Sequence, residues 1–217
     1  MLGIAYKILC YAPPLLLAVI LHEIAHGAVA YKFGDPTAAQ RGRLTFNPIK
    51  HIDPFMTILL PALLVMANSP VVFGGAKPVP INPMYFKNPR RGMMWVAFAG
   101  PFTNICLAFI SMMLYKNYAM ALMQANGPAP EILLAWLQLS ILVNIVLALF
   151  NLFPILPLDG GRILAGLMPL KISRAMHRLE KYGLLIIFLL LYLGVFNRAF
   201  TPVFNYVINY MESILVV

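Results

Sequence analysis

His22, Glu23 and His26 form the pattern H-E-x-x-H within ILHEIAHGAVAYKF, residues 20–33. In a helix, residues i and i+4 lie one above the other on one face, so the two imidazoles point the same way. That spacing lets both reach one zinc ion at about 2.0–2.1 Å. Glu23 lies about 100° round the helix from His22, where its carboxylate can act on a water molecule without being a ligand. The pattern predicts a zinc site with Glu23 as its general base.

The segment around this pattern is apolar, and so is most of the chain. Of the 217 residues, 61% are hydrophobic and 11% are charged, whereas a soluble domain carries about 25% charged residues. We therefore expect an integral membrane protein, all-α and polytopic, with about five to six transmembrane helices. Ionisable groups inside a membrane span are costly and mark functional sites by default. The membrane setting thus favours a metal site over a pair of helix-packing histidines.

The positive charge of the chain lies mainly in the loops between the apolar runs. A net charge of +9 would suggest nucleic acid binding in a soluble protein. Here it indicates cytoplasmic loops and contact with the lipid bilayer, so no nucleic acid partner is expected. Cys10 and Cys106 are far apart in apolar runs, so the sequence indicates neither a disulfide framework nor a cysteine zinc site.

A zinc hydrolase uses three protein ligands and keeps the fourth position for water, so one ligand must come from elsewhere. The candidates are Asp35, Asp53, Asp159, Glu131, Glu180, Glu212, His51 and His177. Asp35 lies in a Gly-Asp-Pro turn, and Asp53 has the position of a helix cap. Asp159 differs because it follows a long apolar run with turn-forming prolines and precedes Gly160-Gly161. Such a break at membrane depth needs protein or a water cavity beside it, which favours Asp159 as a ligand; a helix cap is the alternative.

The two halves of this site must meet at one depth in the membrane. They do so most simply if the apolar run 131–153 has the same direction as the first span, 8–33. Loops 32–51 and 69–91 are both rich in lysine and arginine, which places both on the cytoplasmic side. We therefore expect residues 52–80 to enter the membrane and return, as a re-entrant helix and β-strand near the zinc site.

Three motifs resemble the site-2 protease family of intramembrane zinc metalloproteases. They are HEIAH in the first span, GPFTN at 100–104 and NLFPILPLDGG at 151–161, and they occur in the order typical of that family. The resemblance implies that His22, His26 and Asp159 bind zinc and that Glu23 is the catalytic base.

The same resemblance implies a set of substrate-binding residues. Asn151 is expected to hold the substrate backbone, and Asn104 to line the site. The segment FGGAKPVPIN, 73–82, resembles the membrane-dipping strand that pairs with an unfolded substrate, and it contains Gly74 and Gly75. Independently, an exposed edge strand supplies backbone partners to an extended peptide.

The resemblance also implies a domain plan and an activity. We expect residues 1–217 to form a single membrane-embedded metalloprotease domain of the short branch, without PDZ or CBS domains. Its catalytic core would cover about 8–165, with additional C-terminal membrane segments at about 180–217. The implied enzyme is an intramembrane zinc metalloendopeptidase with one Zn²⁺ per chain, acting on peptide bonds in or near transmembrane segments. Its partners would be transmembrane proteins or remnant signal peptides, in a prokaryotic cell membrane, with the active site nearer the cytoplasmic side.

Two other functions use the same residues. A zinc or cation transporter could employ the three ligands, but transport favours ligands along a path rather than at one point. A catalytically inactive scaffold could bind membrane helices, although an intact set of ligands and base argues for activity.

Overall fold

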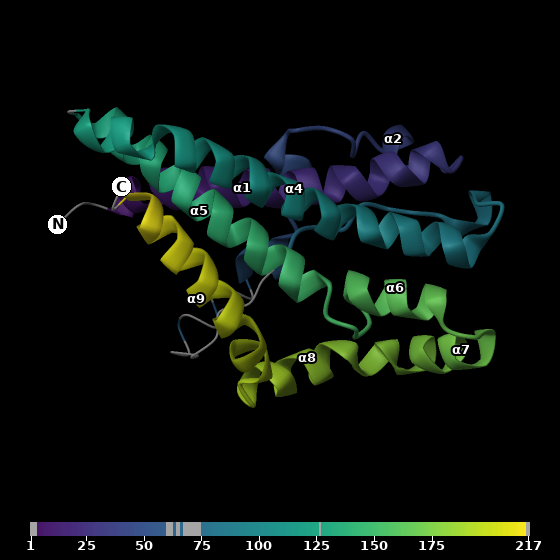
Figure 1. Ribbon diagram of the computed structural model, residues 1–217. Coiled ribbons are helices and arrows are strands. Elements are labelled where there is room, and N and C mark those ends of the chain that lie inside the picture. The colour runs from purple at the N-terminus through teal and green to yellow at the C-terminus, as the bar shows by residue number, and fades with distance from the viewer. Residues whose placement is uncertain (1–3, 60–62, 64–65, 67–74, 126, 216–217) are drawn as a thin grey trace.

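Three long helices form the centre of the protein. The computed structural model describes residues 4–59, 63, 66, 75–125 and 127–215. Helices α1 (Ile4–Lys32), α4 (Pro89–Gln124) and α5 (Pro128–Asn151) pack against one another (Figure 1), and each is long and apolar enough to cross a membrane. Figure 1 shows α1 and α5 running in the same direction and α4 running against them. The parallel arrangement that the two halves of the site require is therefore present.

Turn-forming residues set the ends of these helices. Gly34 follows α1 with a φ of 99°, a conformation that glycine adopts without strain. Helix α4 starts at Pro89, and the Asn88 side chain accepts a hydrogen bond from the Arg91 N–H. Proline at the first helical position and asparagine as the cap are both favourable. The ends of α1 and α4 are thus encoded locally.

The chain between α1 and α4 begins and ends at the same end of the three-helix bundle. The rings of Phe33 and Phe86 lie 6.0 Å apart at the two ends of this segment. It contains α2 (Thr37–Gln40) and the single turns η1 (Pro48–His51), η2 (Pro54–Leu59) and η3 (Pro83–Tyr85). The Gly75 N–H donates to Met56 O at 3.0 Å. The outgoing leg (residues 52–59) and the returning leg (residues 75–82) therefore lie side by side. This course agrees with the expected re-entrant unit.

The expected β-strand within that unit needs a correction. Residues 75–82 are not part of a regular strand, and none is found in the rest of the described chain. Pro78 and Pro80 have no N–H to donate to a ladder. The Lys77 N–H donates to His51 O, and the Val79 N–H donates to a side chain of α1. The returning leg is therefore held by separate contacts rather than by a sheet.

The C-terminal part consists of shorter helices. They are α6 (Asp159–Leu167), α7 (Leu170–Leu179), η4 (Glu180–Tyr182), α8 (Gly183–Tyr192) and α9 (Val195–Leu215). Residues 170–192 and 195–214 meet at a bend of 63°, where Gly194 has a φ of 68°. The ring of Phe196, just after the bend, packs on Phe150 and Phe153 and fixes α9 to the end of α5.

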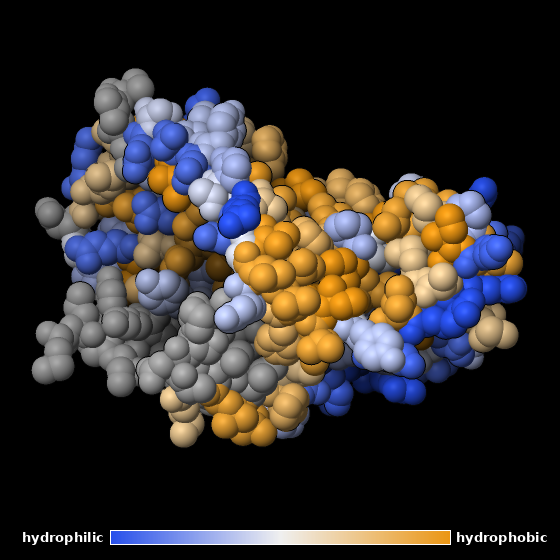
Figure 2. Space-filling view, turned by 90° about the horizontal axis from the view of Figure 1, so that it is seen from below, coloured by the Kyte–Doolittle hydropathy of each residue, from blue (hydrophilic) through white to orange (hydrophobic). Residues whose placement is uncertain are grey.

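The polytopic all-α class is confirmed, and the candidate spans can be counted in the described residues. The described residues contain three candidate spans, or up to four if the bent pair counts as one; the expected five to six refer to the whole chain. Two features bear on this count: the two C-terminal runs form one bent pair, and only part of the 55–67 run lies among the described residues. Figure 2 shows a broad hydrophobic area in the middle of one face, with hydrophilic residues gathered to either side. A contiguous exposed apolar area is typical of a surface that contacts a membrane or a partner.

Candidate metal centre

His22 and His26 lie one turn apart on α1 and form one side of the candidate centre. Both are buried, with exposed fractions of 7% and 8%. Their Nε2 atoms are 3.0 Å apart. The i, i+4 spacing therefore brings two imidazole nitrogens to one point, as the sequence predicted.

Asp159 comes to the same point from the far end of the chain. Its Oδ2 lies 3.2 Å from His22 Nε2 and 3.3 Å from His26 Nε2. Helix α5 ends at Asn151, and α6 begins with Asp159 after a tight turn. A Cβ on Gly160 would collide with the carbonyl group of Leu152, so α6 can pack on this turn only with a glycine there.

The Nδ1 atoms of both histidines, on the far side of each ring from Nε2, make hydrogen bonds. His26 Nδ1 lies 2.6 Å from the Val96 carbonyl oxygen, which can only accept, so His26 carries a proton on Nδ1. His22 Nδ1 lies 2.6 Å from Asn104 Oδ1. With the protons at Nδ1, a neutral imidazole presents the lone pair of Nε2 to the centre. This arrangement is the usual support of a metal-binding histidine.

The orientation of the Asn104 amide is fixed by its other contacts. Its Nδ2 donates to Ala18 O at 3.3 Å and to Asn144 Oδ1 at 2.8 Å. Asn144 Nδ2 in turn donates to Ser140 O. Because Nδ2 faces two acceptors, Oδ1 must face His22 and accept its proton. Fully buried, Asn104 connects all three long helices behind the metal centre.

The residues present fit a zinc ion. Two Nε2 atoms and one carboxylate oxygen, all acceptors, lie within 3.0–3.3 Å of one another, and a cation between them relieves their mutual repulsion. Ligands about 2.0–2.1 Å from a tetrahedral zinc ion are separated by about 3.3 Å, close to these distances. His22, His26 and Asp159 are the one such group of metal-binding side chains found in the described part of the chain. Two histidines and a carboxylate are also the donor set of catalytic zinc sites.

Gly100 of α4 provides the space in which the imidazoles sit. A Cβ at this position would lie 2.5 Å from His26 Cε1 and Nε2 and 2.6 Å from His22 Cε1. Real Cβ atoms do not approach other atoms so closely, so any side chain here would displace the rings. This glycine belongs to the GPFTN motif, but its contact with the two imidazoles depends on helix packing, which the motif alone does not reveal.

Comparison with known proteins decides the family. The model of peptidase family M50 matches residues 11–122 and 116–194. The chain belongs to peptidase family M50. It is 43% identical over 198 residues to "Putative zinc metalloprotease YwhC" of Bacillus subtilis, covering 89% of this chain and 81% of that relative. It is also similar to "Putative zinc metalloprotease Rip2" of Mycolicibacterium smegmatis, with 29% identity over 85% of this chain and 67% of the relative.

A more distant relative extends the similarity to archaea. "Zinc metalloprotease MJ0392" of Methanocaldococcus jannaschii is 26% identical over 72% of this chain and 34% of the relative. No solved structure matches the chain at a significant level. The protein is thus a zinc metallopeptidase of the site-2 protease kind and an integral membrane protein. The resemblance based on three motifs is confirmed, and so is zinc as the cofactor.

In this M50 peptidase, Glu23 is held by the returning leg of the re-entrant unit. Its Oε2 accepts a hydrogen bond of 2.7 Å from the Val79 N–H. Glu23 is half-buried and does not belong to the group of metal-binding side chains. Its position therefore suits a base rather than a ligand. The Val79 N–H could not be recognised from sequence, because every residue except proline carries such a group.

The expected substrate-binding residues lie in different surroundings. Asn151 is half-buried at the end of α5, and its Nδ2 donates to Leu147 O of the same helix. Gly75 is exposed, and its carbonyl accepts a hydrogen bond from Thr57 Oγ1 at 2.6 Å. Gly74 lies outside the described residues. Asn104 lies behind His22, at the opposite side of the imidazole from the ligand atoms. The substrate-binding roles stay predictions, and for Asn104 the contacts favour positioning of His22.

Proposed function

We propose that this protein is an intramembrane zinc metalloendopeptidase that hydrolyses peptide bonds in or near transmembrane segments of membrane-anchored proteins. One observation carries the proposal: two Nε2 atoms and a carboxylate oxygen converge within 3.3 Å, between helices long enough to span a membrane. The catalytic core would cover about residues 8–165. Helices α8 and α9 would be additional membrane segments of the same domain.

The ligands would be His22, His26 and Asp159, one zinc ion per chain. Zinc supplies a Lewis acid that polarises the scissile carbonyl group and makes water a nucleophile near neutral pH. The chain's own contribution is to hold the two imidazoles in one tautomer, through Asn104 and the Val96 carbonyl. Preset ligands lose little freedom on binding, which favours tight retention of the metal.

Glu23 would act as the general base. It would take a proton from the attacking water and deliver it to the leaving amine, so that the C–N bond breaks to give a carboxylate and an amine. The Val79 N–H fixes one carboxylate oxygen, which leaves the other free to turn toward the water. This hydrogen bond links the proposed base directly to the returning leg.

The returning leg would also receive the substrate. A transmembrane helix must unwind before its peptide bonds can be attacked, and an extended segment offers backbone partners to such a stretch. Pro78 and Pro80 have no N–H, so this leg would pair mainly through its carbonyl groups. A hollow of about 960 Å³ runs along Val79 and Ile81 to α6 and α7. It would supply water and a route to the site.

The charges of the loops support one orientation of the protein in the membrane. Loops 32–51 and 69–91 are basic, and the positive-inside rule would place the end of the bundle that carries them in the cytoplasm. The active site would then open toward the cytoplasmic side of a prokaryotic cell membrane, as the bacterial origin of the relatives supports. Substrates would be transmembrane proteins or remnant signal peptides.

The test compares wild type with Glu23→Gln in detergent or nanodiscs, for bound zinc and for cleavage of a model transmembrane substrate. We expect zinc retained at about one per chain, with cleavage lost by a factor of at least about 10². Unchanged cleavage would refute the assigned base. Zinc transport that survives in the variant without any cleavage in wild type would favour a carrier instead.

A further inference from the structure

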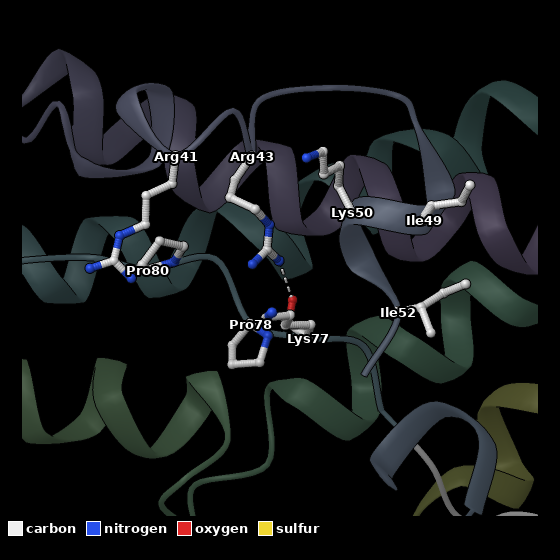
Figure 3. Close-up of a pocket in the computed structure, with 8 residues that line it drawn as sticks. All are labelled: Arg41, Arg43, Ile49, Lys50, Ile52, Lys77, Pro78 and Pro80. Atoms are coloured by element: carbon white, nitrogen blue, oxygen red, sulfur yellow. Dashed lines mark hydrogen bonds between the residues drawn. The ribbon is translucent and has the colours of Figure 1, made fainter. Parts of the chain in front are cut away.

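A second hollow along the returning leg is basic, and it shares Pro78 with the hollow of about 960 Å³. Its volume is about 500 Å³, and it is lined by Arg41, Arg43, Ile49, Lys50, Ile52, Lys77, Pro78 and Pro80. Figure 3 shows Arg41 and Arg43 reaching from the upper loop toward the returning leg, with Lys50 beyond Arg43. Four of these eight residues are basic and none is acidic. Four cations without a lining counter-ion repel one another, so an anion in the hollow would stabilise it.

Arg43 is the buried member of this group. Its exposed fraction is 6%, whereas Arg41, Lys50 and Lys77 are exposed. Its Nη2 donates to Lys77 O at 2.6 Å (Figure 3). Its Nε is buried and has no hydrogen-bond partner among the residues that the structure describes. A buried guanidinium with unmatched donors is costly unless a counter-charge lies beside it.

We propose that this hollow binds a phosphate-bearing anion. The planar guanidinium fork matches the oxygens of phosphate, and flexible lysines close around them as point charges. A volume of about 500 Å³ is within the range of small-molecule sites. The charge of the hollow, its buried arginine and its size therefore agree on one class of ligand.

The rim of the hollow favours a phospholipid headgroup as the source of the phosphate. Ile49 lines it with an exposed fraction of 74%, and Phe46, three residues earlier in the chain, is 67% exposed. Exposed apolar side chains next to basic ones are typical of contact with the membrane interface. A soluble phosphate compound shares the headgroup chemistry but gains nothing from these apolar residues.

A ligand here would contact the segment that holds the proposed base. Arg43 binds the carbonyl of Lys77, and two residues further on the Val79 N–H binds Glu23. The binding site itself does not depend on the proposed function, because it can be measured without any cleavage assay.

The test uses the full chain in a neutral detergent with two probes. Native mass spectrometry measures retention of phosphatidylglycerol against phosphatidylcholine, and calorimetry measures binding of inorganic phosphate. The double variant Arg41→Gln/Lys50→Gln removes two charges from the hollow but keeps the Arg43–Lys77 contact. Its control, Lys87→Gln/Arg91→Gln, removes the same charges from exposed positions that do not line the hollow.

We expect the hollow variant to weaken binding about tenfold or more and the control to change it less than about twofold. Preferential retention of phosphatidylglycerol by wild type supports the site with a lipid headgroup as ligand. Binding of inorganic phosphate without a lipid preference supports the site with a soluble phosphate compound. Equal losses in both double variants, or no binding of either probe, would overturn the proposal.

Discussion

Glu23 of α1 accepts a hydrogen bond of 2.7 Å from the backbone N–H of Val79, 56 residues further along the chain. The contact joins the H-E-x-x-H helix to the returning leg of the re-entrant unit. A side chain expected to move protons is thus held by the segment expected to receive substrate. Base and substrate would keep a fixed relation to each other as long as this hydrogen bond is intact.

Val79→Pro removes this N–H while keeping an extended backbone between two existing prolines. A hydrogen bond to a charged group contributes about 1.5–3 kcal/mol, so we expect kcat to fall by about tenfold or more. Zinc content should stay at the wild-type value, because no ligand is touched. Val79→Ala keeps the N–H and serves as the control. Equal losses of kcat in the two variants would show that the side chain, not the N–H, matters.

Gly100→Ala places a methyl group where the two imidazoles lie. The rings must move, so we expect the affinity for zinc to fall by roughly 10–100-fold. Competition with a metal-binding dye measures this directly. Ile105→Ala, at a half-exposed position of the same helix, should leave the affinity unchanged. Tight zinc binding by a folded Gly100→Ala protein would mean that the imidazoles do not pack on α4 as described.

Asn104→Ala removes the acceptor that fixes His22 Nδ1. We expect a loss of zinc affinity of about 10–100-fold, together with a lower melting temperature, because the amide also joins three helices. Asn144→Ala removes a contact of Asn104 but none of His22. Its effect on zinc affinity should be several-fold smaller, whereas its effect on stability should be comparable. The reverse order would contradict the positioning role of Asn104.

Asp35 gives a pH dependence of stability outside the membrane spans. Burial raises the pKa of its carboxyl, but hydrogen bonds from the Thr37 hydroxyl, the Asn82 N–H and the Thr37 N–H outweigh it and hold the pKa below its usual value. The unfolded chain therefore binds a proton more readily. The stability that ionised Asp35 contributes to the folded protein is complete above the ordinary carboxyl pKa of about 3.9. It is lost as the pH falls through the lower pKa of the folded state.

Melting temperatures between pH 3 and 6 measure this effect. In Asp35→Asn we expect a lower melting temperature at pH 6, by roughly 2–4 °C for about 1 kcal/mol, and a flatter fall toward pH 3. Thr37→Val removes one hydrogen-bond donor to Asp35, so its melting temperature at pH 6 should lie between those of wild type and Asp35→Asn. A wild-type slope that persists unchanged in Asp35→Asn would assign the acid sensitivity to other carboxyls.

Much of the site followed from local rules. The positions of His22 and His26 follow from helical spacing, and Asp159 was favoured because a double glycine broke an apolar run. The structure brings these three residues together. The parallel course of α1 and α5 followed from the same requirement, combined with the charges of the loops.

Other features of the site depend on contacts between segments far apart in the chain, which local sequence patterns do not predict. The tautomers of the two histidines are set by Asn104 and the Val96 carbonyl, from a helix that meets α1 only after packing. The expected strand at 73–82 was wrong for its described part, because the N–H groups of Lys77 and Val79 bind a carbonyl and a side chain instead of a ladder. The basic loop residues were expected to set the topology and to contact lipid, and burial of Arg43 is not visible in that pattern.

Zinc-edge X-ray absorption of the purified protein tests the central claim most directly, because it measures the ligands themselves. A centre made by His22, His26 and Asp159 predicts four-coordinate zinc with two imidazole nitrogens at about 2.0–2.1 Å and oxygen donors at about 2.0–2.2 Å. His26→Ala should lose one imidazole from this set. A sulfur ligand at about 2.3 Å, from Cys10 or Cys106, or zinc with oxygen ligands alone, would contradict the account.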